Sequence, residues 1–249
     1  MNYTASVFDF FKSPKWGMNM LYGGICILIP IIGPIVLMGW HVGGMYGRSN
    51  WRDFEGYPLF DFGKFGQMME RGVWPFLVQL VMGLVMVPVL LLVMGGPMMG
   101  MMAVLPEPNR NSATPDSIPP EMLAMLGLMI LGYVCVVGLM VLVSKPLMIR
   151  AAMVQDFGKS FSWAFMKSFI AKTWLQQIAS LVFVIFAAMV LMMIGMVACF
   201  IGMYFTMSII FFAQWHLDRQ LYELYLARGG EPVEVSAKIR DVPPVLPAS

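Results

Sequence analysis

Four long runs without a charged residue constrain this chain more than any other feature of its sequence. They cover residues 16–47, 72–106, 122–144 and 173–217. Each run is longer than the roughly 18 to 20 apolar residues that a helix needs to cross the hydrocarbon core of a bilayer. The sequence therefore predicts an all-α, polytopic membrane protein.

The composition points to the same class. Of the 249 residues, 59% are hydrophobic and 12% are charged, and the mean hydropathy is +0.75, whereas roughly a quarter of the residues of a soluble domain are charged. We expect one membrane domain over residues 1–228, followed by an extended, proline-containing cytoplasmic tail over residues 229–249. No small-residue cleavage site follows the first apolar run, so we expect that run to remain as an anchor.

The distribution of positive charge predicts the topology. Fifteen of the sixteen Lys and Arg residues lie in four clusters, and Arg110 lies alone in a fifth segment. If each run crossed the membrane once, nine positive residues would face outward and seven inward, contrary to the positive-inside tendency. If the first and last runs each enter and return on the same side, all fifteen clustered residues face the cytoplasm. We therefore expect about six membrane segments in a bacterial inner membrane, with both termini cytoplasmic.

The lengths of the runs agree with two hairpins. The last run would form a single helix about 67 Å long, against a hydrocarbon core of about 30 Å, so a turn is expected near residues 195–202. The first run is shorter and is interrupted by Pro30, Gly33 and Pro34, which predict a turn. Its two halves either cross as short tilted helices or re-enter, and re-entrant backbone has to be buried by other protein.

The two central runs predict single spans over residues 73–93 and 122–143. A proline-rich, polar external loop over residues 105–120 is expected to join them. Beyond the last run, an amphipathic helix is expected to continue into water until Gly229 and Gly230 end it.

One tetrapeptide occurs twice in similar surroundings. Residues 61–64 are Asp-Phe-Gly-Lys, and residues 156–159 repeat them 95 residues later, each time between two apolar runs. A basic residue precedes each copy and a Trp opens the run that follows. We interpret this pattern as a parallel internal repeat of approximately residues 35–95 and 122–195, an arrangement also found in transporters.

The repeated tetrapeptide supplies candidate lipid-interface residues. We expect its Asp side chains to cap interfacial helices, its Phe side chains to enter the apolar layer and its Lys side chains to meet anionic headgroups. Aromatic and Lys residues at helical spacing over residues 157–172 predict one amphipathic helix in the interface. A kinase is excluded, because no catalytic loop or Gly-rich loop accompanies the Asp-Phe-Gly. The candidates are Asp61, Phe62, Lys64, Asp156, Phe157 and Lys159.

Each of the two histidines, His41 and His216, directly follows a tryptophan near the cytoplasmic end of a hairpin limb, where aromatic residues form a belt. A metal role for the pair lacks further ligands unless Asp218 or a cysteine joins them. The 27 Met residues are spread through every apolar run, which favours flexible packing over a copper site. The hairpin and structural candidates are Pro30, Gly33, Pro34, Trp40, His41, Trp215 and His216.

Motifs of catalysis are missing from the sequence. No Asp or Glu lies within the four runs, which argues against an ion-driven pump, and no catalytic triad, nucleotide loop or metalloprotease motif occurs. A net charge of +2 without interleaved basic and aromatic residues gives no indication of nucleic-acid binding. We therefore expect no enzymatic activity, no cofactor and no metal.

Three stretches of the sequence resemble one known family. They are residues 29–34 (Ile-Pro-Ile-Ile-Gly-Pro), residues 57–63 (Tyr-Pro-Leu-Phe-Asp-Phe-Gly) and residues 213–222 (Ala-Gln-Trp-His-Leu-Asp-Arg-Gln-Leu-Tyr). Over roughly residues 15–228 the chain resembles the bacterial polytopic membrane family catalogued as domain of unknown function 4013. Relatives often carry Tyr where this chain has Trp40. The resemblance implies the architecture and no reaction, ligand or site.

We expect a non-enzymatic scaffold or accessory subunit of an inner-membrane complex, with the lipid bilayer and other membrane-protein subunits as partners. One alternative is a passive or facilitative transporter whose pathway runs between the two repeats, with backbone groups exposed at the break near Pro30. A weaker alternative is a lipid-binding or lipid-handling protein that uses the two tetrapeptides at the inner leaflet.

Overall fold

The computed structural model describes residues 1–104, 120–197 and 201–240, and no strand occurs among them. The prediction of an all-α fold is thus confirmed. Three helical stretches of the described chain are long and apolar enough to cross a membrane, within Phe62–Met102, Pro120–Val154 and Phe157–Val197. The protein is therefore a helical membrane protein, and the predicted total of six membrane segments stays a prediction.

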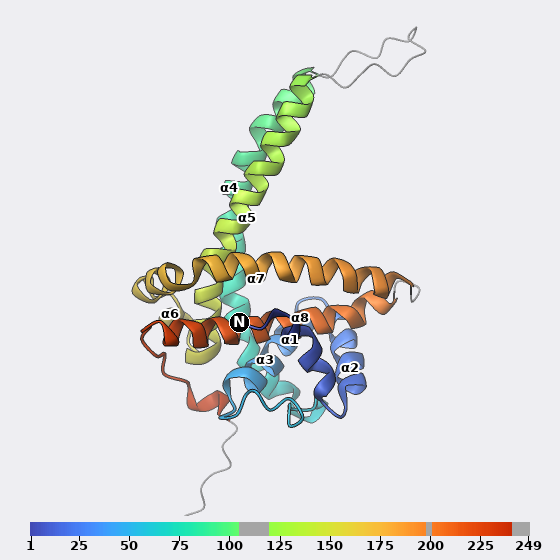
Figure 1. Ribbon diagram of the computed structural model, residues 1–249, viewed down its shortest axis with the longest axis vertical. Helices are drawn as coiled ribbons and strands as arrows, with labels where there is room; N and C mark the ends of the chain where they lie inside the picture. The colour runs from blue at the N-terminus through green and yellow to red at the C-terminus, as the bar shows by residue number, and fades with distance from the viewer. Residues whose placement is uncertain (105–119, 198–200, 241–249) are drawn as a thin grey trace, which may run out of the picture. The chain divides into compact units, whose positions relative to one another are not determined.

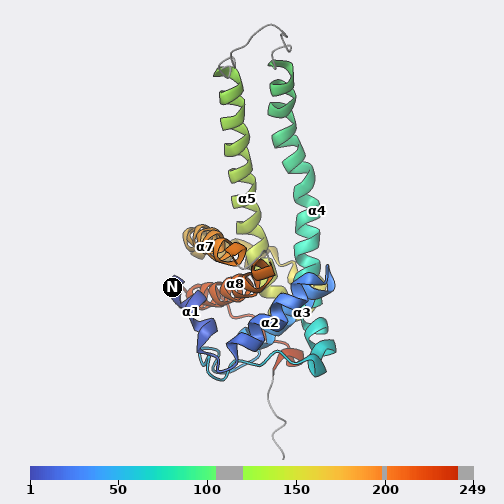
Figure 2. The same cartoon turned by 90° about the vertical axis from the view of Figure 1, so that its right-hand side faces the viewer.

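The chain divides into two compact units, residues 1–79 with 142–249, and residues 80–141. The second unit is a hairpin made from the later part of α4 (Phe65–Val104) and the earlier part of α5 (Pro120–Val154), whose two limbs run side by side in both views (Figures 1 and 2). At 1.5 Å per residue, residues 80–104 extend about 37 Å, which crosses a core of about 30 Å once with some tilt. The predicted external loop lies outside the described residues, apart from Pro120 at the start of α5.

The first apolar run forms two short helices, α2 (Trp16–Leu28) and α3 (Ile32–Tyr46). The predicted turn is confirmed: the chain reverses at Pro30, and the next residue, Ile31, has a φ of 67°. A Cβ on Gly33 would lie 1.6 Å from the Cys26 carbonyl oxygen, so only glycine allows the two limbs to approach this closely. Pro34 lies in the first turn of α3, where its missing N–H costs no helical bond. Helices of 13 and 15 residues are only about 20 and 22 Å long.

The last run forms the antiparallel helices α7 (Trp163–Val197) and α8 (Ile201–Ala227), which lie side by side in Figure 1. The predicted turn near residues 195–202 is confirmed, because α7 ends at Val197 and α8 begins at Ile201. A Cβ on Gly195 would lie 2.8 Å from the backbone of Gly202. This pair of glycines lets the two helices meet closely beside the turn.

Helix α8 is the centre of the first unit. It contacts α7, α2, α3 and the N-terminal helix α1 (Tyr3–Phe8), which is followed by the 3-10 turn η1 (Asp9–Lys12). In Figure 2 these elements gather around α8. Apolar side chains are buried along most of its length, and they include Ile209, Phe212, Ala213, Trp215, Leu217, Leu221 and Tyr225.

Helix α8 ends at Ala227, just before the two glycines that were predicted to end it, Gly229 and Gly230. The backbone N–H of Gly229 donates to the Leu226 carbonyl, and that of Gly230 donates to the Tyr225 carbonyl. Gly229 has a φ of +74°, the left-handed conformation that glycine adopts without strain. This pair of hydrogen bonds is the Schellman arrangement that satisfies the last carbonyls of a helix.

The tail beyond α8 is irregular as far as residue 240, apart from the 3-10 turn η3 (Ala237–Ile239). It is also packed. The Val233 N–H donates to the Tyr222 hydroxyl, the Ser236 N–H donates to the Met153 carbonyl, and Ile239 is fully buried. The first part of the predicted cytoplasmic tail is thus held by the chain itself.

The prediction of one amphipathic helix over residues 157–172 is wrong. Helix α6 covers only Phe157–Ser160, and α7 begins separately at Trp163. The two intervening residues leave the helical conformation because Ser162 caps the new helix, its hydroxyl accepting from the Phe165 N–H at 3.4 Å.

Candidate functional site

Both copies of the repeated tetrapeptide form the same local structure. Asp61 caps the 3-10 turn η2 (Phe62–Lys64), accepting from the Gly63 N–H at 2.8 Å. Asp156 caps α6, accepting from the Lys159 N–H at 3.0 Å. The capping prediction is confirmed in both copies. Phe62 and Phe157 are 49% and 37% exposed, and their entry into the apolar layer of a membrane stays a prediction.

The tertiary surroundings of the two copies differ. The strand-like segment before Asp61 is clamped from both sides, because the Phe60 N–H donates to Asn19 of α2 and the Trp40 indole donates to the Pro58 carbonyl, each at 3.0 Å. At the second copy, the Arg150 guanidinium donates to the Lys159 carbonyl at 2.7 Å. The copies therefore share a capped turn but not a common environment.

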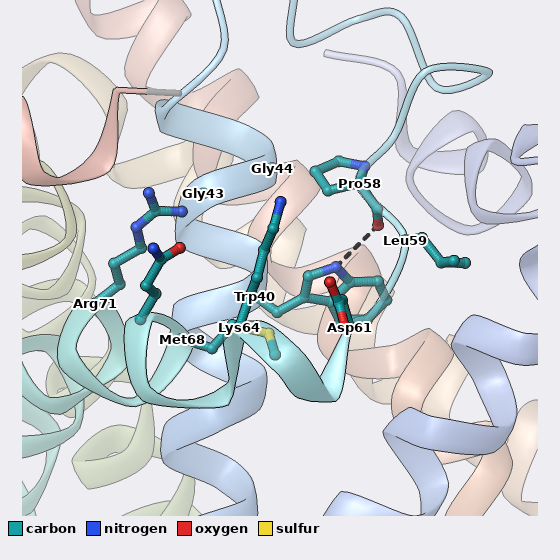
Figure 3. A pocket seen from close by; sticks show the side chains of 10 residues that line it. Trp40, Gly43, Gly44, Pro58, Leu59, Asp61, Lys64, Met68 and Arg71 are labelled. Carbon is teal, nitrogen blue, oxygen red and sulfur yellow. Dashed lines mark hydrogen bonds between the residues drawn. The ribbon is translucent and has the colours of Figure 1, made fainter. Parts of the chain in front are cut away.

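A small cavity of about 50 Å³ adjoins the first copy. Figure 3 shows Lys64 and Arg71 extending from η2 and α4 toward Gly43 and Gly44 of α3, with the Trp40 to Pro58 hydrogen bond at the opposite side. Arg71 also donates to the Lys238 carbonyl of the tail at 3.2 Å. The cavity is thus bordered by cationic side chains from η2 and α4 and by two glycines of α3.

The two histidines converge in the core of the first unit. The ring of Phe212 lies 6.0 Å from His41 and 5.8 Å from His216, between centroids. The tryptophans beside them, Trp40 and Trp215, are only 3% and 2% exposed. The packing of α3 against α8 encloses these pairs, and their place in an aromatic belt at the membrane surface stays a prediction.

Each histidine has polar partners. The hydroxyl of Tyr57 lies 3.0 Å from Nδ1 of His41, and burial raises the pKa of this hydroxyl, which keeps it protonated. His216 lies 3.2 Å from the Asp9 carboxylate through Nε2 and 2.8 Å from the Gln220 amide through Nδ1. Because the amide nitrogen can only donate, Nδ1 of His216 accepts and Nε2–H donates to Asp9.

A metal site is not assembled from these residues. Within residues 1–104, 120–197 and 201–240, no group of three or more His, Cys, Asp or Glu side chains is arranged to hold a metal ion. The partner of His216 is Asp9, which also pairs with Lys12 at 2.7 Å. Asp218, the extra ligand considered from the sequence, is engaged elsewhere.

Asp218 forms a buried ion pair with Lys145, with 2.5 Å between Nζ and Oδ1. The two side chains are 2% and 8% exposed. Sequence reasoning missed this pair, because it counted Lys145 with the cytoplasmic charges and expected the helix to continue into water beyond the last run, directly after residue 217. The available signal was position: each residue directly adjoins a charge-free run.

The loop between α3 and η2 is fixed onto α8 by aromatic and charged side chains. Arg219 lies over the rings of Tyr46 and Trp51, at 5.3 and 5.7 Å. The Glu223 carboxylate accepts from the Trp51 indole at 2.5 Å and pairs with Arg52 at 2.6 Å. Such contacts over the face of an aromatic ring are favourable for a guanidinium. None of these residues was a candidate from the sequence.

Taken together, the polar groups of the first unit join segments that lie far apart in the sequence.

A family model described as Protein of unknown function (DUF4013) matches residues 22–200. The chain belongs to the DUF4013 family. The matched region contains both tetrapeptides and the break at Pro30, and it ends before residues 213–222. No curated protein and no solved structure matches this DUF4013 chain.

Proposed function

We propose that this DUF4013 protein is a non-enzymatic scaffold or accessory subunit of a membrane protein complex. The observation that carries this proposal is the apolar surface of the second unit. Leu84, Leu91, Leu92 and Met99 of α4 are 64%, 67%, 80% and 73% exposed. Lipid or neighbouring helices have to cover such a surface, since water cannot.

Unpacked glycines favour neighbouring helices as part of that cover. A Cβ added to Gly83, Gly95, Gly96 or Gly138 would meet nothing within 4 Å. Glycine in a helix interior costs about 1 kcal/mol relative to Ala, and small residues allow membrane helices to approach one another closely. The hairpin thus offers glycines without a covering side chain, against which a helix of a second membrane protein can pack.

Purification of the full chain in native lipid, followed by mass spectrometry, tests this role. We expect a stoichiometric membrane-protein partner that is lost when Gly95 and Gly96 are replaced by Leu. The matched control is Gly66→Leu in the first unit, which also meets nothing within 4 Å and should retain the partner. Recovery of the wild-type chain without a protein partner would overturn the proposal.

We also propose the predicted location, a bacterial inner membrane with both termini cytoplasmic. Residues near both ends of the described chain lie in the first unit: the Asn2 N–H donates to Gln220 at 2.6 Å, and Lys238 of the tail pairs with Glu70. A reporter fused after Arg71 is expected to be cytoplasmic. An external signal from that fusion would contradict the topology. The passive transporter stays an alternative prediction.

A further inference from the structure

An open groove of about 660 Å³ lies between α2 and the first tetrapeptide. It is continuous with the cavity in Figure 3, since Pro58, Leu59, Asp61 and Lys64 line both. One wall comes from α2, and the other from the segment that leads into η2. The remaining lining residues are Lys15, Met18, Tyr22, Phe60 and Phe62.

The aromatic wall of this groove is rigidly held. The Tyr22 ring lies 5.2 Å from Phe62 and 6.0 Å from Phe60, between centroids. The backbone below it is fixed by Asn19, which is 1% exposed and accepts from the Phe60 N–H. The groove is therefore a built feature of the fold, because α2 and the tetrapeptide segment are bonded directly to each other.

The groove combines this apolar wall with unneutralised positive charge. Lys15 and Lys64 are exposed, and neither side chain has a hydrogen-bond or ion-pair partner among the described residues. The one acidic lining residue, Asp61, directs a carboxylate oxygen to the Gly63 N–H. Two lysines thus face one carboxylate, and the amino end of α2 adds partial positive charge at Lys15.

The apolar rim indicates which anion fits. Met18, Leu59 and Phe62 are 42%, 41% and 49% exposed at the groove. A soluble phosphate compound would leave these side chains in water, whereas a phospholipid would cover them with its acyl chain. Cationic side chains beside exposed aromatic and aliphatic groups are typical of protein segments at the surface of an anionic membrane.

We propose that this groove is a binding site for one anionic phospholipid. Lys15 and Lys64 bind the headgroup phosphate, and the acyl chain lies along Met18, Leu59 and Phe62. On the side of the second tetrapeptide, a pocket of about 500 Å³ is lined by Arg150 and Lys172, and Lys159 is not among its lining residues. We assign the site to the first tetrapeptide, and it does not depend on the scaffold role.

Lipid titration of the purified chain tests the site. The protein, held in a neutral detergent, is titrated with phosphatidylglycerol or phosphatidylcholine, and bound lipid is measured by native mass spectrometry. Replacing Lys15 or Lys64 by Gln is expected to weaken phosphatidylglycerol binding about fivefold each, since a lysine near an anionic lipid contributes about 1 kcal/mol. The matched control, Lys159→Gln, should bind like the wild type.

The outcomes separate the possible ligands. Preference for phosphatidylglycerol over phosphatidylcholine, lost in the Lys15 and Lys64 variants alone, supports the site. Equal binding of both lipids, or an equal loss in the Lys159 variant, overturns it. Inorganic phosphate should not displace the lipid, and displacement at equal concentration would show that a soluble phosphate compound is the ligand instead. Both lysines are exposed, so unchanged thermal unfolding verifies that the variants fold.

Discussion

Replacing Asp218 by Ala is expected to lower the free energy of unfolding of the first unit by about 3 to 5 kcal/mol. The Asp218 carboxylate lies 2.5 Å from Nζ of Lys145, and both side chains are enclosed. Without the carboxylate, the Lys145 ammonium stays buried without its counter-charge, and its desolvation is no longer offset. The loss should appear in equilibrium unfolding of the detergent-solubilised chain, followed by circular dichroism.

Two further variants show that the effect arises from burial. The double change Lys145→Met with Asp218→Leu should recover most of the lost stability, because an apolar pair of similar volume replaces both buried charges. Glu70→Ala removes a carboxylate from the exposed pair with Lys238, 2.9 Å apart, and should cost at most about 1 kcal/mol. If Asp218→Ala and Glu70→Ala had equal effects, the Lys145–Asp218 pair would have to be open to water.

Local signals in the sequence predict much of this fold. The break between α2 and α3 follows from Pro30 and Gly33, the turn beside Gly195 follows from the length of the last run, and Gly229 ends α8. The caps at Asp61 and Asp156 are equally local. Apart from the turn in the last run, each depends on residues a few positions apart, and for that reason it is visible in one sequence.

The contacts of the candidate site are not local, and the sequence does not determine them. Lys145 and Asp218 are 73 residues apart, and Trp51 and Glu223 are 172 apart. Charges at the end of an apolar run are normally exposed at the membrane surface, so the general rule gave the wrong environment for Lys145. Helix packing determines which charged side chains are buried, and the periodicity of the sequence does not predict how the helices pack.

One packing signal was nevertheless present, in the spacing Gly39-x-x-x-Gly43 on α3. Helices that pair through such glycines approach until their backbones touch. A Cβ on Gly39 would lie 1.6 Å from the Met68 carbonyl oxygen of α4, and one on Gly72 would lie 1.8 Å from the Ile35 carbonyl oxygen of α3. Helices α3 and α4 therefore pack backbone to backbone at this crossing, which also positions Lys64 and Arg71 beside Gly43 and Gly44 (Figure 3).

Gly39→Ala is accordingly expected to destabilise the first unit by about 3 kcal/mol, the upper end of the usual cost of overpacking, because backbone atoms cannot rotate away as a side chain can. Gly83→Ala makes the same chemical change in α4 where nothing lies within 4 Å, so it should stabilise by about 0.5 to 1 kcal/mol through helix propensity. Unfolding curves of the two variants would thus shift in opposite directions. Shifts of the same sign would mean that α3 and α4 do not pack through Gly39.

Gly72→Ala should lower the free energy of unfolding about as much as Gly39→Ala. The double variant should lose less stability than the sum of the two single losses, because once the helices have separated at one glycine the other no longer clashes.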